Sequence, residues 1–378
     1  MKTLQMFAVV TPGLEPVCAR ELQALGLERV QVEPGGVAFE GGLGELYLAN
    51  LMLRSASRVL VRLGRFGCRD FPTLYKRALR LPWGAFVRPG TALSVRTSCH
   101  ASRLIHTQRI AETIAAAACH SLGLAREEME KGSFSQLLVV RLEEDEALLS
   151  LDSSGELLHR RGWRTAQLEA PLRESLAAGI LQLLGWDGTV PLLDPMCGSG
   201  TFPIEAAWLA MRFAPGERRD FAFMRWPHFR PGLWQVLLDE AKSRRRPLSV
   251  PISGMDRALS AIAVAKENAH RAGVEDAVYF ACGELSALEP ETARGFLIAN
   301  PPYGKRLGRG VDLVRSYRAL GRALKGAFAG WEGAFLCPDP ALARETGLKL
   351  EKVALLAHGG LNVALLKVLR QKNMRIPA

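Results

Sequence analysis

The stretch that decides the fold is residues 191–207, which read PLLDPMCGSGTFPIEAA. Its first four residues are an apolar run that ends at Asp194, and a helical period resumes at Ile204, so the pattern predicts a strand, a tight turn and a helix. Gly198 and Gly200 lie in that turn, where glycines allow a ligand to approach the backbone closely. The turn has neither the full GxGxxG pattern nor a lysine after its second glycine, which argues against a phosphate-binding loop.

The sequence around this turn alternates apolar strands with helical stretches, which indicates a mostly parallel, doubly wound α/β sheet. The predicted strands cover Pro191 to Asp194, Ile252 to Asp256, Val278 to Ala281, Phe296 to Ala299 and Gly333 to Cys337. Two later strands, near residues 353–357 and 361–369, are joined by Gly359-Gly360 and predict an antiparallel hairpin at one edge. We expect this Rossmann-like domain to span residues 165–378.

The N-terminal part has a different organisation. Residues 1–65 follow a βαββαβ order, with the turn Pro34-Gly35-Gly36 between the second and third strands, which predicts a ferredoxin-like α+β domain. Residues 66–164 form a second expected domain, with a helix near 104–122 and a closing hairpin around the acidic turn at 143–146. Neither pattern specifies an activity, because such folds host many functions.

Two segments allow more than one interpretation. Residues 153–164 read SSGELLHRRGWR, in which arginines beside Trp163 suit phosphate contact and base stacking, although a packed tryptophan on a strand edge is an equal alternative. Residues 215–246 are an inserted helical excursion that ends in the basic run KSRRR. That insertion either touches nucleic acid or covers a sheet.

Composition favours a polyanionic partner. Lys and Arg number 49 against 38 Asp and Glu, a formal net charge of +11. The seven cysteines are scattered without CxxC spacing, which favours reduced thiols in the cytoplasm and predicts no metal site. No apolar run approaches the ~20 residues of a membrane-spanning helix, so no membrane partner is expected. The pattern leaves the oligomeric state open.

The most informative stretch is Asn300-Pro301-Pro302-Tyr303-Gly304, directly after a predicted strand. The consecutive prolines fix the backbone, so the loop presents carbonyl groups in set directions. The Asn300 side-chain oxygen and the Pro301 carbonyl can each accept one hydrogen of an aromatic amine, which aims the amine lone pair at an activated methyl group. Tyr303 can stack on an extruded base. Asp256, at another strand end, can accept both hydroxyls of a ribose.

These motifs together resemble the Rossmann-like amino-methyltransferases, on the stretches DPMCGSGTFPIEAA and NPPYGKRLG. With the N-terminal segments, the chain resembles bacterial THUMP-domain methyltransferases of the RlmL type; the stretch SLDSSGELLHRRGWR followed by APLRE is similar to their link between domains. The resemblance implies S-adenosylmethionine as cofactor, RNA gripped by a THUMP domain at 66–164, and 2-methylguanosine in large-subunit (23S) ribosomal RNA as product.

The resemblance also implies site residues. Catalytic roles fall on Asn300, Pro301, Pro302 and Tyr303. Cofactor contacts fall on Asp194, Pro195, Cys197, Gly198, Ser199, Gly200, Thr201, Asp256, Glu284 and Asn300. The chain departs from the family pattern at Glu284, where the family commonly has an aspartate that contacts the cofactor adenine. Some relatives carry a further C-terminal methyltransferase domain, and the length of this chain predicts only one methylation activity.

Three alternatives remain at this point. The tetrapeptide recognises an amine and not a particular base, so adenine or guanine in tRNA or DNA is the runner-up substrate. A 5-methylpyrimidine enzyme would need a cysteine nucleophile, for which Cys337 is the candidate, although core packing suits that residue better. A non-catalytic RNA-binding factor for ribosome assembly would keep the fold without needing the Asn300 loop.

Overall fold

The computed structural model describes residues 3–125, 134–164, 172–302 and 313–369. The chain divides into two compact units that are discontinuous in sequence. Unit 1 comprises residues 1–10, 18–158 and 216–240, and unit 2 comprises residues 11–17, 159–215 and 241–378. The chain therefore passes between the units several times.

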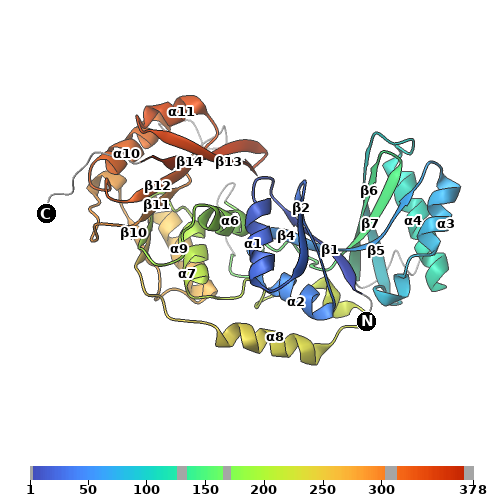
Figure 1. Ribbon diagram of the computed structural model, residues 1–378. Helices are drawn as coiled ribbons and strands as arrows, with labels where there is room; N and C mark the ends of the chain where they lie inside the picture. The colour runs from blue at the N-terminus through green and yellow to red at the C-terminus, as the bar shows by residue number, and fades with distance from the viewer. Residues whose placement is uncertain (1–2, 126–133, 165–171, 303–312, 370–378) are drawn as a thin grey trace. The chain divides into compact units, whose positions relative to one another are not determined.

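Unit 1 is built on one seven-stranded sheet with the strand order β2-β3-β1-β4-β7-β6-β5 (Figure 1). Its elements, with α1 reaching into it from residue 18 on, are β1 (Leu4–Val10), α1 (Glu15–Ala24), β2 (Glu28–Glu33), β3 (Gly36–Gly41), α2 (Leu43–Met52), β4 (Ala56–Gly67), α3 (Phe71–Leu79), η1 (Trp83–Ala85), β5 (Thr91–His100), α4 (Thr107–Leu122), β6 (Phe134–Glu143) and β7 (Glu146–Asp152). The predicted βαββαβ order is confirmed. Because β4 pairs with β7, the two expected N-terminal folds share a single sheet.

The insertion supplies part of the core of unit 1. Its residues 216–240 include η2 (Ala222–Arg225) and the first ten residues of α8 (Pro231–Ser243). Phe223 stacks on Tyr47 of α2 with ring centroids 4.4 Å apart, and Phe229 and Trp234 lie edge-on to the same tyrosine. The insertion is therefore a packing element of the N-terminal sheet unit, which accounts for its aromatic content.

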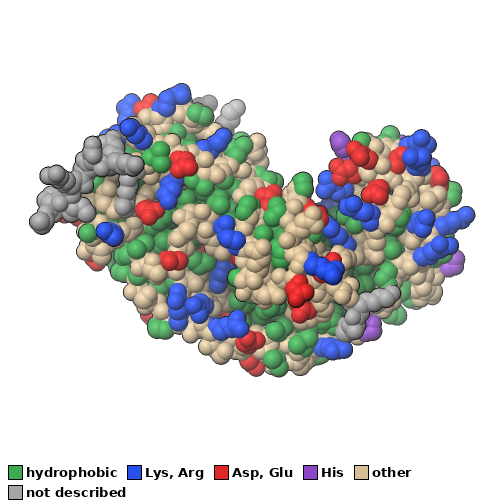
Figure 2. All heavy atoms as spheres, viewed as in Figure 1, with side chains coloured by type: hydrophobic (Ala, Val, Ile, Leu, Met, Phe, Trp, Pro, Cys, Tyr) green, Lys and Arg blue, Asp and Glu red, His purple; other side chains and the backbone are tan. Residues whose placement is uncertain are grey.

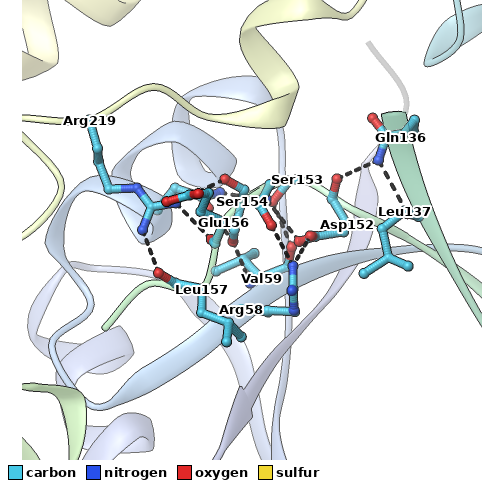
Figure 3. A network of polar contacts seen from close by, with 12 residues as sticks. Arg58, Val59, Gln136, Leu137, Asp152, Ser153, Ser154, Glu156, Leu157 and Arg219 are labelled. Atoms are coloured by element: carbon cyan, nitrogen blue, oxygen red, sulfur yellow. Dashed lines mark hydrogen bonds and ion pairs between the residues drawn. The ribbon is translucent and has the colours of Figure 1, made fainter. Parts of the chain in front are cut away.

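A buried polar network joins three parts of unit 1, and Figure 3 shows it from close by. Arg58 of β4 forms an ion pair with Asp152 at the end of β7 and donates to the Gly155 carbonyl at 2.6 Å. Ser154 Oγ accepts the backbone N–H of Val59 at 2.8 Å. The Arg219 guanidinium, from the insertion, donates to three backbone carbonyls of the following loop, those of Ser154, Glu156 and Leu157. The strand end, the loop and the insertion are thereby fixed to one another.

Unit 2 contains a second seven-stranded sheet with the order β10-β9-β8-β11-β12-β14-β13 (Figure 1). Its elements are α6 (Glu174–Leu183), β8 (Leu192–Asp194), α7 (Thr201–Ala210), β9 (Ile252–Asp256), α9 (Leu259–Ala272), β10 (Tyr279–Cys282), η3 (Leu285–Ala287), β11 (Phe296–Ala299), α10 (Leu313–Lys325), β12 (Glu332–Cys337), α11 (Pro340–Glu345), β13 (Leu350–His358) and β14 (Leu361–Val368). The first five strands in this order, β10, β9, β8, β11 and β12, are parallel to one another. Strand β14 pairs antiparallel with both β12 and β13. This is the predicted doubly wound sheet with an edge hairpin.

Both faces of this sheet are covered. On β11, Phe296 and Ile298 belong to a core cluster with residues of α6, α7 and α9, whereas Leu297 and Ala299 belong to a cluster with residues of α10 and α11. Successive side chains of a strand point to opposite faces, so the alternation places helices on either side. All four residues of β11 are buried, as expected for a central parallel strand. The open carboxyl edge is consequently where a ligand has access.

Candidate active site

Three polar residues follow neighbouring strands at the carboxyl edge of the unit 2 sheet. In the parallel register, Asp194 of β8 pairs with Gly254 of β9, so Asp256 lies two residues further toward the same edge. Leu193 of β8 pairs with Leu297 of β11, which places Asn300 beyond the end of β8 as well. The sheet therefore brings together the strand-end residues that the sequence singled out.

The glycine turn after β8 is held in a backbone conformation that suits glycine. Gly198 and Gly200 have φ values of 51° and 83°. A Cβ on Gly200 would lie 2.9 Å from the Phe280 ring, while one on Gly198 would meet nothing within 4 Å. Gly200 is thus required for close packing, whereas the Gly198 backbone faces open space. The Gly198 N–H donates to Asp256 Oδ2 at 3.0 Å, which ties the turn to the end of β9.

The carboxylates at the edge differ in environment. Asp194 is 2% exposed and accepts the Met196 N–H at 3.0 Å. The pKa of Asp194 is raised to about 8, mainly by burial and in smaller part by the neighbouring charge of Asp256, while the hydrogen bond from the Met196 N–H lowers it. Asp256 is half-buried, and its Oδ1 accepts the Ala258 N–H at 2.9 Å. A cationic group placed against Asp194 would favour its ionised form.

The Asn300 loop begins where β11 ends. Asn300 is half-buried and Pro301 is buried. Within the described residues, the buried Oδ1 atom of Asn300 has no hydrogen-bond partner. A buried acceptor without a partner is costly in a folded protein, so its presence at an open sheet edge points to a ligand donor. Tyr303 lies outside the described residues.

Other predicted residues take mainly structural positions around the turn. Pro195 and Cys197 are buried, and the Cys197 N–H donates to the Met255 carbonyl at 2.8 Å. Glu284 follows β10, is 62% exposed, and lies 3.8 Å from Arg315 Nη2. Cys337 is 3% exposed within a core cluster, in agreement with a packing role.

Of the two interpretations of Trp163, base stacking is wrong and packing is confirmed. Its side chain is fully buried in the core of unit 2, so no ring face is available to RNA. Arg161 is 1% exposed and pairs with buried Glu205 of α7 at 3.3 Å. Arg161 therefore serves packing inside unit 2, because a buried guanidinium group needs a carboxylate or carbonyl partner, whereas Arg160 of the same stretch is exposed.

Sequence reasoning missed two residues that hold the turn. Arg164 donates to Ser199 Oγ at 3.2 Å and to Thr201 Oγ1 at 2.8 Å. Asn268 of α9 donates to the Ser199 carbonyl at 3.0 Å. Arg164 was included in a basic stretch that suggested phosphate contact, and Asn268 is an ordinary polar residue of a helix, so neither carried a distinguishing signal.

Among the residues that the structure describes, no group of three or more His, Cys, Asp or Glu side chains is arranged to hold a metal ion. Nor does any described helix combine the length and apolar character needed to cross a membrane.

Comparison with known proteins assigns each part of the chain. The RlmL ferredoxin-like domain matches residues 5–60, the THUMP domain matches residues 68–152, and the RMKL-like methyltransferase domain matches residues 161–350. The Synechocystis protein named "Putative RNA methyltransferase slr0064" is 35% identical over 373 residues, covering 97% of this chain and 96% of that protein.

A longer relative and a solved structure agree with this assignment. The ribosomal RNA large subunit methyltransferase K/L of Syntrophotalea carbinolica is 37% identical over 382 residues, covering 96% of this chain and 53% of that protein. The chain thus spans about half the length of the K/L methyltransferases that it matches. The crystal structure of SMU.472, described as "a putative methyltransferase complexed with SAH", has a TM-score of 0.88 at 31% identity, covering 99% of this chain and 100% of that one.

The fold of unit 2 is that of the S-adenosylmethionine-dependent methyltransferases. The chain belongs to the RlmL-like family of methyltransferases, in which a ferredoxin-like domain and a THUMP domain precede the catalytic domain.

Proposed function

We propose that this protein transfers a methyl group from S-adenosylmethionine to the exocyclic N2 amine of a guanine in 23S ribosomal RNA. The observation that carries the proposal is the buried Asn300 Oδ1, which has no hydrogen-bond partner among the described residues. An amine hydrogen of a base would satisfy that oxygen. The residue stands at the carboxyl edge of the sheet, where ligands of open α/β folds bind.

The chemistry follows from the weak nucleophilicity of an aromatic amine, whose lone pair is delocalised into the ring. Asn300 Oδ1 and the Pro301 carbonyl each accept one amine hydrogen, and so orient the lone pair away from the ring plane. Pro301 and Pro302 fix the direction of these acceptors. Tyr303 would hold the extruded base by stacking. The cofactor supplies a methyl group that is already activated by its positive sulfur, so no metal or strong base is assigned.

The residues at the turn fit such a cofactor. The open space beside Gly198 allows a ligand to lie against the backbone. A cationic ligand beside Asp194, whose pKa is raised to about 8, would stabilise the ionised form of this carboxyl group. Asp256 is fixed by N–H groups of Gly198 and Ala258, and each of its oxygens keeps a lone pair that a ribose hydroxyl can use. Glu284, exposed near this edge, would face the adenine end.

The RNA substrate is assigned from the family. The THUMP domain and the relatives named as RNA or ribosomal RNA methyltransferases support RNA as partner, with residues 66–164 providing the grip and residues 1–65 supporting them. Arg65, Arg69 and Arg103 in unit 1 are more than half exposed, but each lies within 4 Å of an acidic side chain. Figure 2 likewise shows Lys and Arg interleaved with Asp and Glu on the face in view. We place the protein in the cytoplasm with its ribosomal substrate, in keeping with its seven free cysteines.

Mass spectrometry of nucleosides tests the proposal. Ribosomal RNA and tRNA from cells lacking the protein should be analysed before and after incubation with the pure protein and S-adenosylmethionine. We expect 2-methylguanosine to be missing from 23S RNA and restored by the protein. Restoration in tRNA, or at an adenine, would replace the substrate assignment. If RNA from cells lacking the protein contains every methylated nucleoside, and the pure protein still binds RNA, a non-catalytic assembly factor is favoured.

A further inference from the structure

The segment that follows Leu158, where the chain passes from unit 1 to unit 2, contacts the glycine turn of residues 198–201. Leu158 is the last residue of this stretch in unit 1, where it is buried in the core and donates its N–H to the Ser57 carbonyl at 2.8 Å. Five residues later, Trp163 is fully buried in the core of unit 2. The side chain of the next residue, Arg164, is only 11% exposed.

Arg164 binds the polypeptide at four places. Its Nε donates to Glu174 Oε1 at 2.8 Å, and Glu174 is itself 3% exposed. Its Nη1 donates to Ser199 Oγ at 3.2 Å. Its Nη2 donates to Thr201 Oγ1 at 2.8 Å and to the Leu172 carbonyl at 3.1 Å. A planar guanidinium directs five N–H donors over three nitrogen atoms, whereas the three donors of a lysine ammonium share one nitrogen atom and cannot reach acceptors that are spread so widely.

Two of these acceptors flank the glycine that starts α7. Ser199 and Thr201 stand on either side of Gly200, whose φ of 83° permits the turn. Asn268 holds the Ser199 carbonyl from the α9 side, while Arg164 holds the Ser199 hydroxyl. Hydrogen bonds from Asn268 and Arg164 therefore fix the turn from two sides. The Gly198 N–H donates to Asp256 on the ligand-facing edge.

We propose that Arg164 is a positioning residue for S-adenosylmethionine binding, which holds the turn of residues 198–201 in its binding conformation. The inference rests on the proposed cofactor site. The N–H groups of Arg164 donate to acceptors of the protein, and the Glu174 carboxylate balances its charge. It therefore acts through the turn, and its loss changes cofactor affinity rather than the chemical step. The sequence Trp163-Arg164, which packs the chain into unit 2, thus also prepares the cofactor site.

The test compares Arg164→Met with Arg164→Lys and a matched control, Arg246→Met. Arg246 is exposed and donates to the Ala210 carbonyl at 2.6 Å, at the opposite end of the same helix α7. Calorimetric titration with S-adenosylhomocysteine needs neither RNA nor turnover. We expect Arg164→Met to raise Kd at least about tenfold, Arg164→Lys to raise it about threefold, and Arg246→Met to leave it unchanged.

Steady-state kinetics separate positioning from catalysis. For Arg164→Met the KM for S-adenosylmethionine should rise with the Kd, while kcat at saturating cofactor stays within about threefold of the parent. An unchanged Kd, or a fall in kcat with unchanged KM, would overturn the inference. Equal losses in Arg164→Met and Arg246→Met would do the same.

A second variant covers the case in which Arg164→Met does not fold. The double substitution Ser199→Ala, Thr201→Val removes the two hydroxyl acceptors and keeps the Arg164 ion pair with Glu174. We expect its midpoint of thermal unfolding to fall, because two mostly buried guanidinium donors lose their acceptors, and its Kd, measured well below that midpoint, to rise about threefold to tenfold. Parent protein that binds no S-adenosylhomocysteine would instead contradict the proposed function itself, so the two failures are distinguishable.

Discussion

Two polar clusters at strand ends have opposite characters. In unit 1, Asp152 ends β7 and is fully buried, with Arg58 and the Ser154 N–H as partners (Figure 3). In unit 2, Asn300 follows β11 with its Oδ1 unsatisfied among the described residues. A buried polar group that is satisfied by protein contributes to the folded state, whereas one without a partner is a cost that a ligand can offset.

The contrast gives a criterion for separating structural from functional polar residues. The acidic end of β7 and the asparagine after β11 have similar positions in their sheets, but only the second faces an edge where a substrate could donate hydrogen bonds. Substitutions in the first cluster should therefore change the free energy of unfolding. Substitutions in the second should change turnover or affinity and leave that free energy nearly constant.

The largest expected effect is on stability, from Arg58→Met. Removing the guanidinium leaves the buried Asp152 carboxylate without its counter-charge, a change that typically costs about 3 to 5 kcal/mol. Because the Arg58 side chain is 16% exposed, we expect the lower end of that range. Urea unfolding measures the change. Arg141→Met, which breaks a pair with Glu143 whose side chains are 56% and 48% exposed, should cost less than about 1 kcal/mol.

The pH dependence of the Arg58→Met deficit sharpens this test. The pKa of Asp152 is raised to about 6 in total, because burial raises it more than Arg58 and the hydrogen bonds to the carboxylate lower it. A carboxyl pKa above its unfolded value means that the folded state takes up a proton as pH falls, which stabilises it. Without Arg58 the uptake begins at higher pH. The loss in free energy of unfolding caused by Arg58→Met should therefore become smaller between pH 7 and pH 5. A loss that grows on acidification would contradict the charge state assigned to Asp152.

The next effect is on turnover, from Asn300→Ala. One amine hydrogen loses its acceptor, so single-turnover rates should fall by roughly 100-fold or more while affinity for S-adenosylhomocysteine is kept. The matched substitution is Asn50→Ala in the unit 1 network, where Asn50 Nδ2 donates to Ser153 Oγ at 2.9 Å. That variant should lose about 1 to 3 kcal/mol of stability but keep its rate well below its unfolding temperature. If Asn300→Ala lowered stability and kept the rate, while Asn50→Ala lowered the rate, hydrogen-bond satisfaction would not separate structural from functional polar residues.

The meeting of the candidate site residues at one edge of the unit 2 sheet was predictable from sequence, because the signals are local. A strand, its terminal acid and the following glycines lie within ten residues, and the Asn300 tetrapeptide directly follows an apolar strand. Parallel strands bring their carboxyl ends to one edge of the sheet, so these separate motifs could be joined without knowledge of the tertiary contacts. The mostly parallel sheet and the edge hairpin of unit 2 follow from the same alternation of patterns.

The unit 1 network was not predictable, because its partners are distant in the chain. Arg58 and Asp152 are 94 positions apart, and the Trp226 Nε1 donates to Gln136 Oε1 across 90 positions. Hydrophobic periodicity carries no signal for such pairings. The same limitation explains Trp163, whose neighbours suggested RNA contact although its ring is in the core. A basic aromatic stretch has the same composition whether the ring stacks on a base or packs inside the protein.

A smaller effect concerns the cofactor, from Asp256→Ala. Loss of the carboxylate removes the acceptor proposed for the ribose and the partner of the Gly198 N–H. Hydrogen bonds to a charged group contribute about 1.5 to 3 kcal/mol, so the Kd for S-adenosylhomocysteine should rise about 10-fold to 150-fold. Calorimetric titration measures it. Asp152→Asn serves as the comparison from unit 1, and its Kd should match the parent; unchanged affinity in Asp256→Ala would exclude this residue from the site.

The smallest effect is the pH dependence that Asp194 gives to cofactor binding. With a pKa of about 8, this carboxyl is mostly protonated at neutral pH in the free protein. A cationic ligand favours the ionised form, so binding should release a proton, and affinity should increase as pH rises through 8. If the ligand binds only the ionised form, the gain between pH 7 and pH 9 is about tenfold. Because the ligand amine also titrates, Asp194→Asn provides the reference. Titrations in buffers of different ionisation enthalpy should find less proton release in that variant, and equal release in both proteins would mean that Asp194 is already ionised before the cofactor arrives.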